Sequence, residues 1–225
     1  MLRRMIETCF GLPTLSVYSE GDTPFCGGVR SFRKYPEDKG DDLPVTFVKT
    51  HERSHAQTSS KTIYLIRDGR DAICSYAHYL DWTDIADSSY TFNDKRYPRE
   101  HILRYCITGG FRSLPKLTVW SDHVRDWYSR ADTCILHYED IITRSAHDVL
   151  MQVCDALDLF DCGLKFTGKE PATFEQLNQQ NPNFYRRGCP GGWRHDFTDE
   201  LHELFWEHHG DMMRQCGYAM QPELV

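Results

Sequence analysis

Two arginine-bearing segments of the chain contain the residue types that bind phosphate. In the first, the apolar run TIYLIR ends at Arg67, an Asp-Gly pair follows, and a predicted helix carries Ser75 eight positions after Arg67. A guanidinium group and a hydroxyl beside a helix N-terminus suit an anion, because free backbone N–H groups and the positive end of the helix dipole lie there. The alternative is a surface ion pair between Arg67 and Asp68 or Asp71, and the segment alone favours neither interpretation.

The second segment, YRRGCPGGW, places Arg186 and Arg187 directly before Gly188 and two further glycines. Glycine lets backbone N–H groups come close to an anion, and guanidinium groups match the geometry of phosphate oxygens. The composition fits a phosphate clamp. A glycine-rich connector with solvated arginines is the more frequent use of such a sequence, so this segment too needs support from the rest of the chain.

A third segment, VKTHERSH, places Lys49 and His51 at the end of a predicted strand. Ligands of α/β sheets bind at that end, and a histidine titrates near neutrality, which suits a general base. The letters from His51 to His55 also spell HExxH, a zinc-protease signature that must lie on a helix. Because the segment follows a strand and has no apolar stripe, we expect neither zinc nor proteolysis.

Strands and helices alternate along the rest of the chain. Near-continuous apolar runs predict strands at residues 45–50, 62–67 and 133–138, as is typical of a parallel sheet covered on both faces. Apolar spacing predicts helices at the start of the chain, from Asp71 to Tyr79, around Val124, around Val153 and after the N-cap Thr198. We therefore expect one α/β domain over residues 1–225.

Composition limits the partners and the compartment. The 26 lysines and arginines against 33 aspartates and glutamates give a net charge of −7, which argues against nucleic acid as a partner. Nine cysteines without a CxxC pair indicate reduced thiols and a cytoplasmic protein. No run approaches the roughly 18 apolar residues of a membrane span. The oligomeric state cannot be read from the sequence.

Taken in order, these segments resemble the cytosolic type of sulfotransferase that uses 3′-phosphoadenosine 5′-phosphosulfate (PAPS), from residue 1 to about residue 218. The resemblance implies a parallel-sheet α/β fold like that of the P-loop NTPases. It assigns the catalytic base to His51 and a charge-stabilising role to Lys49. It also implies a set of nucleotide-binding residues on four segments: Arg67, Ser75, Tyr138, Phe174, Arg186, Arg187 and Gly188.

The reaction implied by the resemblance moves a sulfuryl group from PAPS to a hydroxyl or amine and leaves adenosine 3′,5′-bisphosphate, with no metal. Arg67, Ser75 and the clamp are assigned to the 3′-phosphate, Tyr138 to the neighbourhood of the adenine, and Phe174 to stacking on it. The acceptor, a small molecule or carbohydrate, is expected to be selected by residues 18–44 and 81–100, and its identity cannot be read from them.

Two departures from the family pattern affect these expectations. Ala172 stands where many members have a threonine near the adenine. The family also opens with a strand and a PKSGTTW-type phosphate loop, whereas MLRRMIETCF resembles the helix after that loop. We therefore expect an N-terminally truncated domain, with an inactive nucleotide-binding relic or a truncated gene product as the alternative to a working transferase.

Overall fold

The computed structural model describes residues 1–16, 44–50, 61–82, 91–92, 95–96, 98–109 and 119–221. The predicted base His51 and the whole HExxH segment lie outside these ranges. So does most of the two loops that were expected to select the acceptor.

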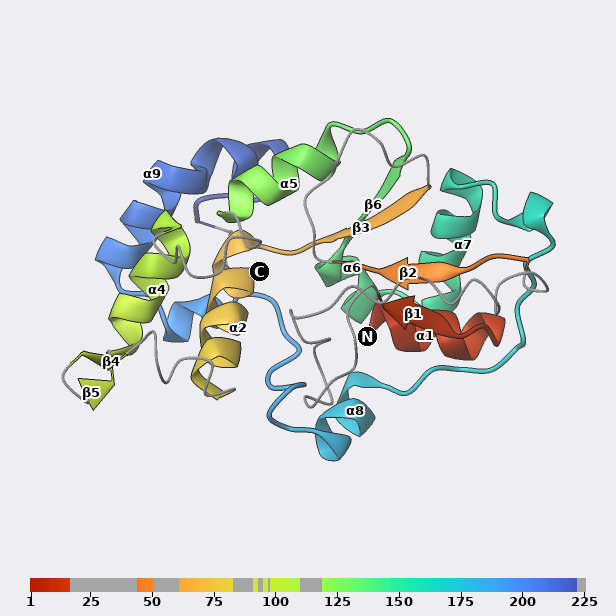
Figure 1. Cartoon of the computed structure of the whole chain (residues 1–225), viewed down its shortest axis with the longest axis horizontal. Helices are drawn as coiled ribbons and strands as arrows, with labels where there is room; N and C mark the ends of the chain where they lie inside the picture. Colours follow the sequence, from red (N-terminus) through yellow and green to blue (C-terminus); the bar gives the residue numbers. More distant parts are fainter. Residues whose placement is uncertain are drawn as a thin grey trace.

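Two pairs of parallel strands form the centre of the fold (Figure 1). β3 pairs with β6, with Tyr64 opposite Ile135, and β1 pairs with β2, with Leu15 opposite Val48. Parallel neighbours need a long crossover connection, and the helices between β3 and β6 lie in such a connection. A short antiparallel pair, β4 and β5, lies apart. The strands are β1 (Thr14–Ser16), β2 (Phe47–Lys49), β3 (Thr62–Ile66), β4 (Thr91–Phe92), β5 (Lys95–Arg96) and β6 (Thr133–His137).

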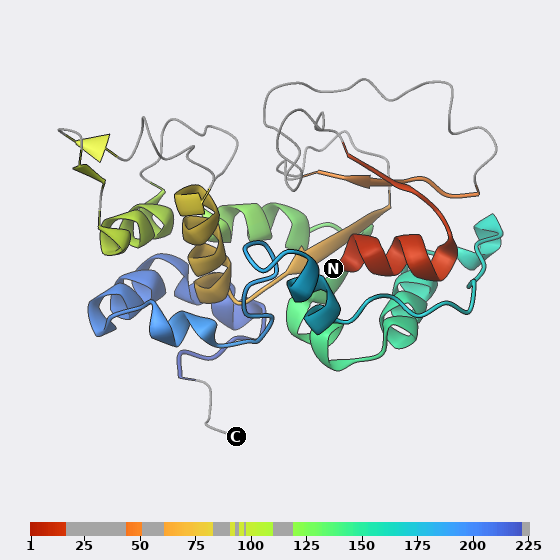
Figure 2. The same ribbon diagram turned by 90° about the horizontal axis from the view of Figure 1, so that it is seen from below.

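Helices surround these strands, with α2, α4, α5 and α9 at one end of the molecule and α1, α6 and α7 at the other (Figures 1 and 2). α8 lies between the two groups, next to the segment that leads to the clamp. The helices are α1 (Leu2–Phe10), α2 (Gly69–Trp82), α4 (Arg99–Thr108), α5 (Trp120–Tyr128), α6 (Tyr138–Thr143), α7 (Ala146–Ala156), α8 (Phe174–Gln180), α9 (Asp199–Gln215) and the short 3₁₀ helices at Phe160–Cys162 and Gly192–His195.

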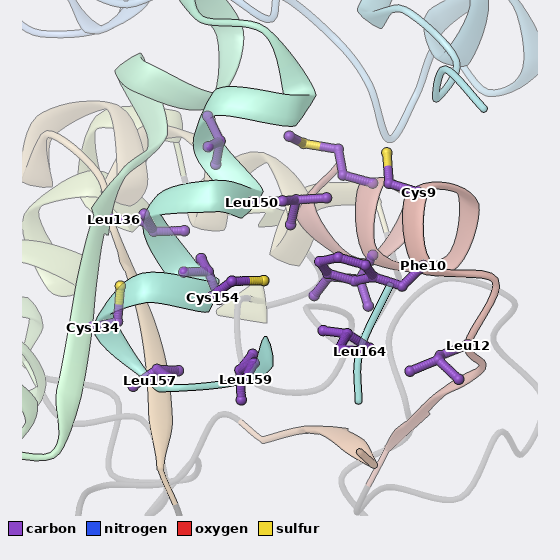
Figure 3. Close-up of a cluster of buried hydrophobic side chains, with 14 of the residues drawn as sticks. Cys9, Phe10, Leu12, Cys134, Leu136, Leu150, Cys154, Leu157, Leu159 and Leu164 are labelled. Atoms are coloured by element: carbon purple, nitrogen blue, oxygen red, sulfur yellow. The ribbon is translucent and has the colours of Figure 1, made fainter. Parts of the chain in front are cut away.

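One core joins α1 and α7 to the strands (Figure 3). Phe10 of α1, Leu150 of α7 and Leu136 of β6 belong to one cluster of buried side chains, and Leu136 and Leu150 are 0% exposed. Phe47 of β2 packs against the same cluster, so both parallel pairs share this core. Truncation of leucines buried to this degree typically costs about 2–5 kcal/mol, so this cluster holds the two pairs together.

A second core lies under α2, α4 and α9, where Phe205 is 0% exposed. It brings α2 close to its neighbours at Gly69, the first residue of the helix. A β-carbon at Gly69 would lie 2.8 Å from both Phe205 and Trp120, so only glycine fits there. This packing fixes the start of α2 directly after β3.

The side chain of Arg70, in the first turn of α2, binds the segment that follows α9. The side chain is 1% exposed and pairs with Asp68 through two hydrogen bonds of 3.0 and 2.7 Å. It also donates to the carbonyl oxygens of Met220 and Ala219 at 2.8 and 3.1 Å. The ring of Trp193 lies 4.3 Å from the guanidinium carbon. A buried charge is stable only when it is paired and hydrogen-bonded in this way.

The observed elements agree with most of the sequence-based expectations. All three predicted strands are present, and the hydroxyl of Thr198 accepts a hydrogen bond from the backbone N–H of Leu201 at 3.3 Å, as expected for an N-cap. Full burial of the strand residues was wrong for Leu65, which is 39% exposed. The strand β1 was not predicted. Within the described ranges, no helix combines the length and apolar character needed to cross a membrane.

Candidate functional site

The strand ends of β3 and β6 bring Arg67 and Tyr138 together. Ile66 lies opposite His137 in the parallel register, so the next residue of each strand leaves the sheet at the same edge. The guanidinium carbon of Arg67 lies 4.6 Å from the centre of the Tyr138 ring, a cation–π contact. The Nε atom of Arg67 is buried and has no hydrogen-bond partner among the described residues. A buried donor without a partner is rare and suits the oxygen of a ligand.

Asp71 on α2 joins this strand end to the glycine-rich segment more than a hundred residues later. Its carboxylate accepts hydrogen bonds from the backbone N–H groups of Gly191 at 2.7 Å and Trp193 at 2.8 Å. Burial raises the pKa of Asp71, while Arg67 at 3.9 Å and the two N–H donors favour the ionised form. The β3–α2 turn and the predicted clamp therefore form one structural unit.

The two clamp arginines differ in their contacts. Arg187 donates through Nη1 to the carbonyl oxygen of Gly192 at 2.8 Å and to Asp196 at 3.0 Å. Arg186 is half-buried, and its burial, followed by the positive charge of Arg187, lowers its pKa. Positive charge is thus concentrated here, and an anion bound beside Arg186 would relieve the repulsion.

Phe174 lies against the clamp at Gly188. Thr173 and Gln176 form a capping box that fixes the first turn of α8, where Phe174 is the first residue. A β-carbon at Gly188 would lie only 2.3 Å from the Phe174 ring, and the backbone angle φ at Gly188 is +62°. The next residue, Cys189, lies near Tyr138. An aromatic side chain therefore flanks the arginine cluster on the clamp side.

The contacts of the other predicted residues, Ser75 and Lys49, say less about the site. Ser75 is exposed on α2, and the carbonyl of the preceding residue, Cys74, accepts a hydrogen bond from Arg99 at 3.4 Å. Lys49 ends β2, and its charge contributes to lowering the pKa of the Met1 amino group to about 6, after burial and Arg4. Lys49 thus lies beside the N-terminus of α1. The catalytic roles of Lys49 and His51 stay predictions.

The sequence interpretation missed three residues that organise this cluster: Asp71 as a clamp partner, Asp196 and Arg99. Asp71 had been considered only as an ion-pair partner of Arg67, four positions away. Of the two ion pairs considered for Arg67, the one with Asp71 is present at 3.9 Å, whereas Asp68 pairs with Arg70. Asp196 and Arg99 gave no local signal, since their contact depends on how α4 packs. Among the described residues, no group of histidine, cysteine or acidic side chains is arranged to hold a metal ion.

Known proteins resemble this chain in sequence and in fold. A family model described as "Sulfotransferase domain" matches residues 29–217. Mouse sulfotransferase 1E1 is 25% identical, over 92% of this chain and 80% of that protein. A 3-beta-hydroxysteroid sulfotransferase of Cavia porcellus is also 25% identical, over 68% of this chain and 56% of that protein.

A solved structure supports the fold assignment independently. The crystal structure of mouse sulfotransferase SULT7A1 complexed with PAP superposes with a TM-score of 0.56 at 16% identity. The match covers 76% of this chain and 66% of that one.

Proposed function

The chain belongs to the sulfotransferase family, and we propose from that premise that Arg67, Ser75, Arg186, Arg187 and Gly188 bind the 3′-phosphate of PAPS. The observation that carries the proposal is the tie through Asp71, whose carboxylate accepts hydrogen bonds from two backbone N–H groups of the clamp. That tie joins the β3–α2 turn to a segment 120 residues away. These hydrogen bonds hold two arginine-bearing segments that are distant in sequence next to each other.

The described residues fit such a ligand in charge and in shape. Arg67 offers a buried Nε–H without a partner, and Arg186 is half-buried next to other positive charges. Guanidinium groups form charge-assisted hydrogen bonds with phosphate oxygens. Phe174 and Tyr138 supply aromatic faces beside the arginines, and we assign them to the adenine. The bound nucleotide would supply the sulfuryl group that is transferred.

The chain's own residues would position the acceptor and move its proton. We assign the general base to His51, which accepts the proton of the attacking hydroxyl or amine. Lys49, at the end of β2, would stabilise negative charge on the sulfuryl oxygens. Positioning and preorganised charges supply most of the acceleration in comparable group transfers.

The acceptor is proposed to be a small molecule, because the similar proteins include a steroid sulfotransferase by name. Residues 18–44 and 81–100 remain our candidates for selecting it. A cytoplasmic location, reduced cysteines and the absence of a nucleic-acid partner also remain proposals. Within the described part of the chain, eight cysteines are free thiols, and Cys74 and Cys154 are buried in the core.

Calorimetry with two nucleotides tests the binding site. Adenosine 3′,5′-bisphosphate should bind more tightly than adenosine 5′-phosphate, because only the former carries the 3′-phosphate. Arg67→Ala should weaken binding of the bisphosphate by about 1.5–3 kcal/mol, as expected for a lost charge-assisted contact. Equal affinity of both nucleotides, or no effect of Arg67→Ala, would reject the assignment.

Transfer of labelled sulfate from PAPS to a panel of phenols, alcohols and amines tests the reaction. His51→Ala should lower turnover by about 10²–10⁴ with nucleotide binding intact, the usual range for a general base. Nucleotide binding without any transfer in the unaltered chain would instead support the binding-only relic. A stoichiometric zinc ion that is lost on His55→Ala would support the protease reading.

A further inference from the structure

Arg99 occupies a position that local electrostatics disfavour. It is the first residue of α4, where the positive end of the helix dipole repels a cation. Its side chain is 30% exposed and makes contacts with two other segments of the chain. Contacts with other segments therefore offset the unfavourable interaction of the Arg99 charge with the dipole of its own helix.

The first contact joins Arg99 to the clamp. Asp196, with a side chain 10% exposed, accepts from Nε of Arg99 at 3.2 Å through Oδ1 and from Nη1 of Arg187 at 3.0 Å through Oδ2. Each carboxylate oxygen thus serves a different arginine. Within the described residues, the hydrogen bonds of Arg187 use Nη1 alone, which leaves Nε and Nη2 for another acceptor. Without Arg99, Asp196 would have both oxygens available to Arg187.

The second contact joins Arg99 to α2. Its Nη2 donates to the carbonyl oxygen of Cys74 at 3.4 Å, one residue before Ser75. The charge of Arg99 also reaches Arg186, whose pKa it helps to lower after burial and Arg187. The side chain of Arg99 thus contacts both parts of the proposed phosphate site, the clamp side through Asp196 and α2 through Cys74.

We propose that Arg99 is a positioning residue for the 3′-phosphate site, acting through Asp196 on Arg187 and through the Cys74 carbonyl on Ser75. The inference rests on the proposed function. Arg99 occupies one oxygen of Asp196, so that Arg187 keeps its Nε and Nη2 groups available to the ligand. It also couples the clamp to α4, which begins within residues 81–100, the segment proposed to select the acceptor.

The test measures the affinity ratio of adenosine 3′,5′-bisphosphate to adenosine 5′-phosphate by calorimetry on the full chain. Arg99→Ala should reduce this ratio about tenfold, the low end for a charge-assisted contact, with adenosine 5′-phosphate affinity unchanged. Arg104→Ala is the matched control. Arg104 lies on the same helix and pairs with Glu100 and with Glu200 of α9, so its loss should leave the ratio unchanged.

A double-mutant cycle separates positioning from a general loss of stability. If Arg99 acts through Arg187, then Arg99→Ala should add little to the loss caused by Arg187→Ala. Arg99→Lys should recover part of the ratio, because an ammonium group still binds Asp196. Equal weakening of both nucleotides, or full additivity with Arg187→Ala, would overturn the inference. An unaltered chain with no preference for the 3′-phosphate would overturn the proposed function itself, and the inference with it.

Discussion

The ring of Phe174 lies where the side chain of any residue other than glycine at position 188 would be. A β-carbon at Gly188 would approach Cε1, Cζ and Cδ1 of Phe174 to between 2.3 and 2.5 Å. Real β-carbons essentially never come so close to another heavy atom, so the ring and the clamp backbone specify each other's positions.

Gly188→Ala should displace Phe174 and weaken nucleotide binding by about tenfold, as expected for a lost aromatic stacking partner. Gly168→Ala is the matched control, because Gly168 has a similar φ of +74° but nothing within 4 Å of its added β-carbon. Both variants carry the strain of a left-handed residue, about 1–2 kcal/mol. Calorimetry should therefore show a binding defect only in Gly188→Ala, and equal affinities of the two variants would contradict the packing argument.

Asp71→Asn should loosen the clamp. An asparagine has one carbonyl oxygen, so one of the N–H groups of Gly191 and Trp193 would lose its acceptor. The expected loss of unfolding free energy is about 1–3 kcal/mol, the cost of an unsatisfied buried donor. Amide hydrogen exchange should accelerate at Gly191 or Trp193.

Asp211→Asn makes the same charge change at a side chain that is 96% exposed and serves as the control for Asp71→Asn. It should alter neither stability nor exchange at Gly191. If exchange at Gly191 and Trp193 stays slow in Asp71→Asn, some other contact holds the clamp to α2.

His209 makes stability depend on pH. It is 1% exposed, its Nε2 donates to the carbonyl oxygen of Ile107 at 2.9 Å, and its Nδ1 accepts from the hydroxyl of Ser121 at 3.0 Å. Both contacts suit the neutral ring. Burial, above all, lowers the pKa of His209 from 6.5 to about 4.

The unfolded chain therefore binds a proton at His209 at a higher pH than the native chain. The contribution of His209 to stability is complete above pH 6.5 and is lost as the pH falls toward 4, up to about 3 kcal/mol. Denaturant titrations between pH 7 and 4 should show this slope. His209→Gln should reduce it, whereas His208→Gln, at the exposed neighbouring position, should keep most of it, because burial lowers the pKa of His209 more than the charge of His208 does.

Elements with a strong local pattern could be predicted from the sequence, and those fixed by tertiary contacts could not. The stripe of Val149, Leu150 and Val153 predicts α7 because these residues face one core. β1 has three residues and no apolar run of its own. Its partner is β2, a strand distant in sequence, so nothing local indicates the pairing.

In the candidate site too, local patterns could be predicted and tertiary contacts could not. Arg67, Arg186 and Gly188 could be singled out because arginine and glycine suit phosphate, and the family resemblance favoured this use over the alternatives that each segment allows. The carboxylates that organise them could not, because Asp71 and Asp196 act on groups distant in sequence. Their roles follow only from the packing of α2, α4 and the clamp against one another.

The hydrogen bonds from Arg70 to the carbonyl oxygens of Ala219 and Met220 affect when this part of the chain can fold during synthesis on the ribosome. Arg70 lies in the first turn of the helix that carries Asp71 and Ser75, yet two of its acceptors lie 149 and 150 residues later in the sequence. Domains usually begin to fold from the N-terminus during translation. Here the buried guanidinium group has its full set of partners only after Ala219 and Met220 have been made and have left the exit tunnel, so we expect the start of α2 to reach its final packing late in synthesis.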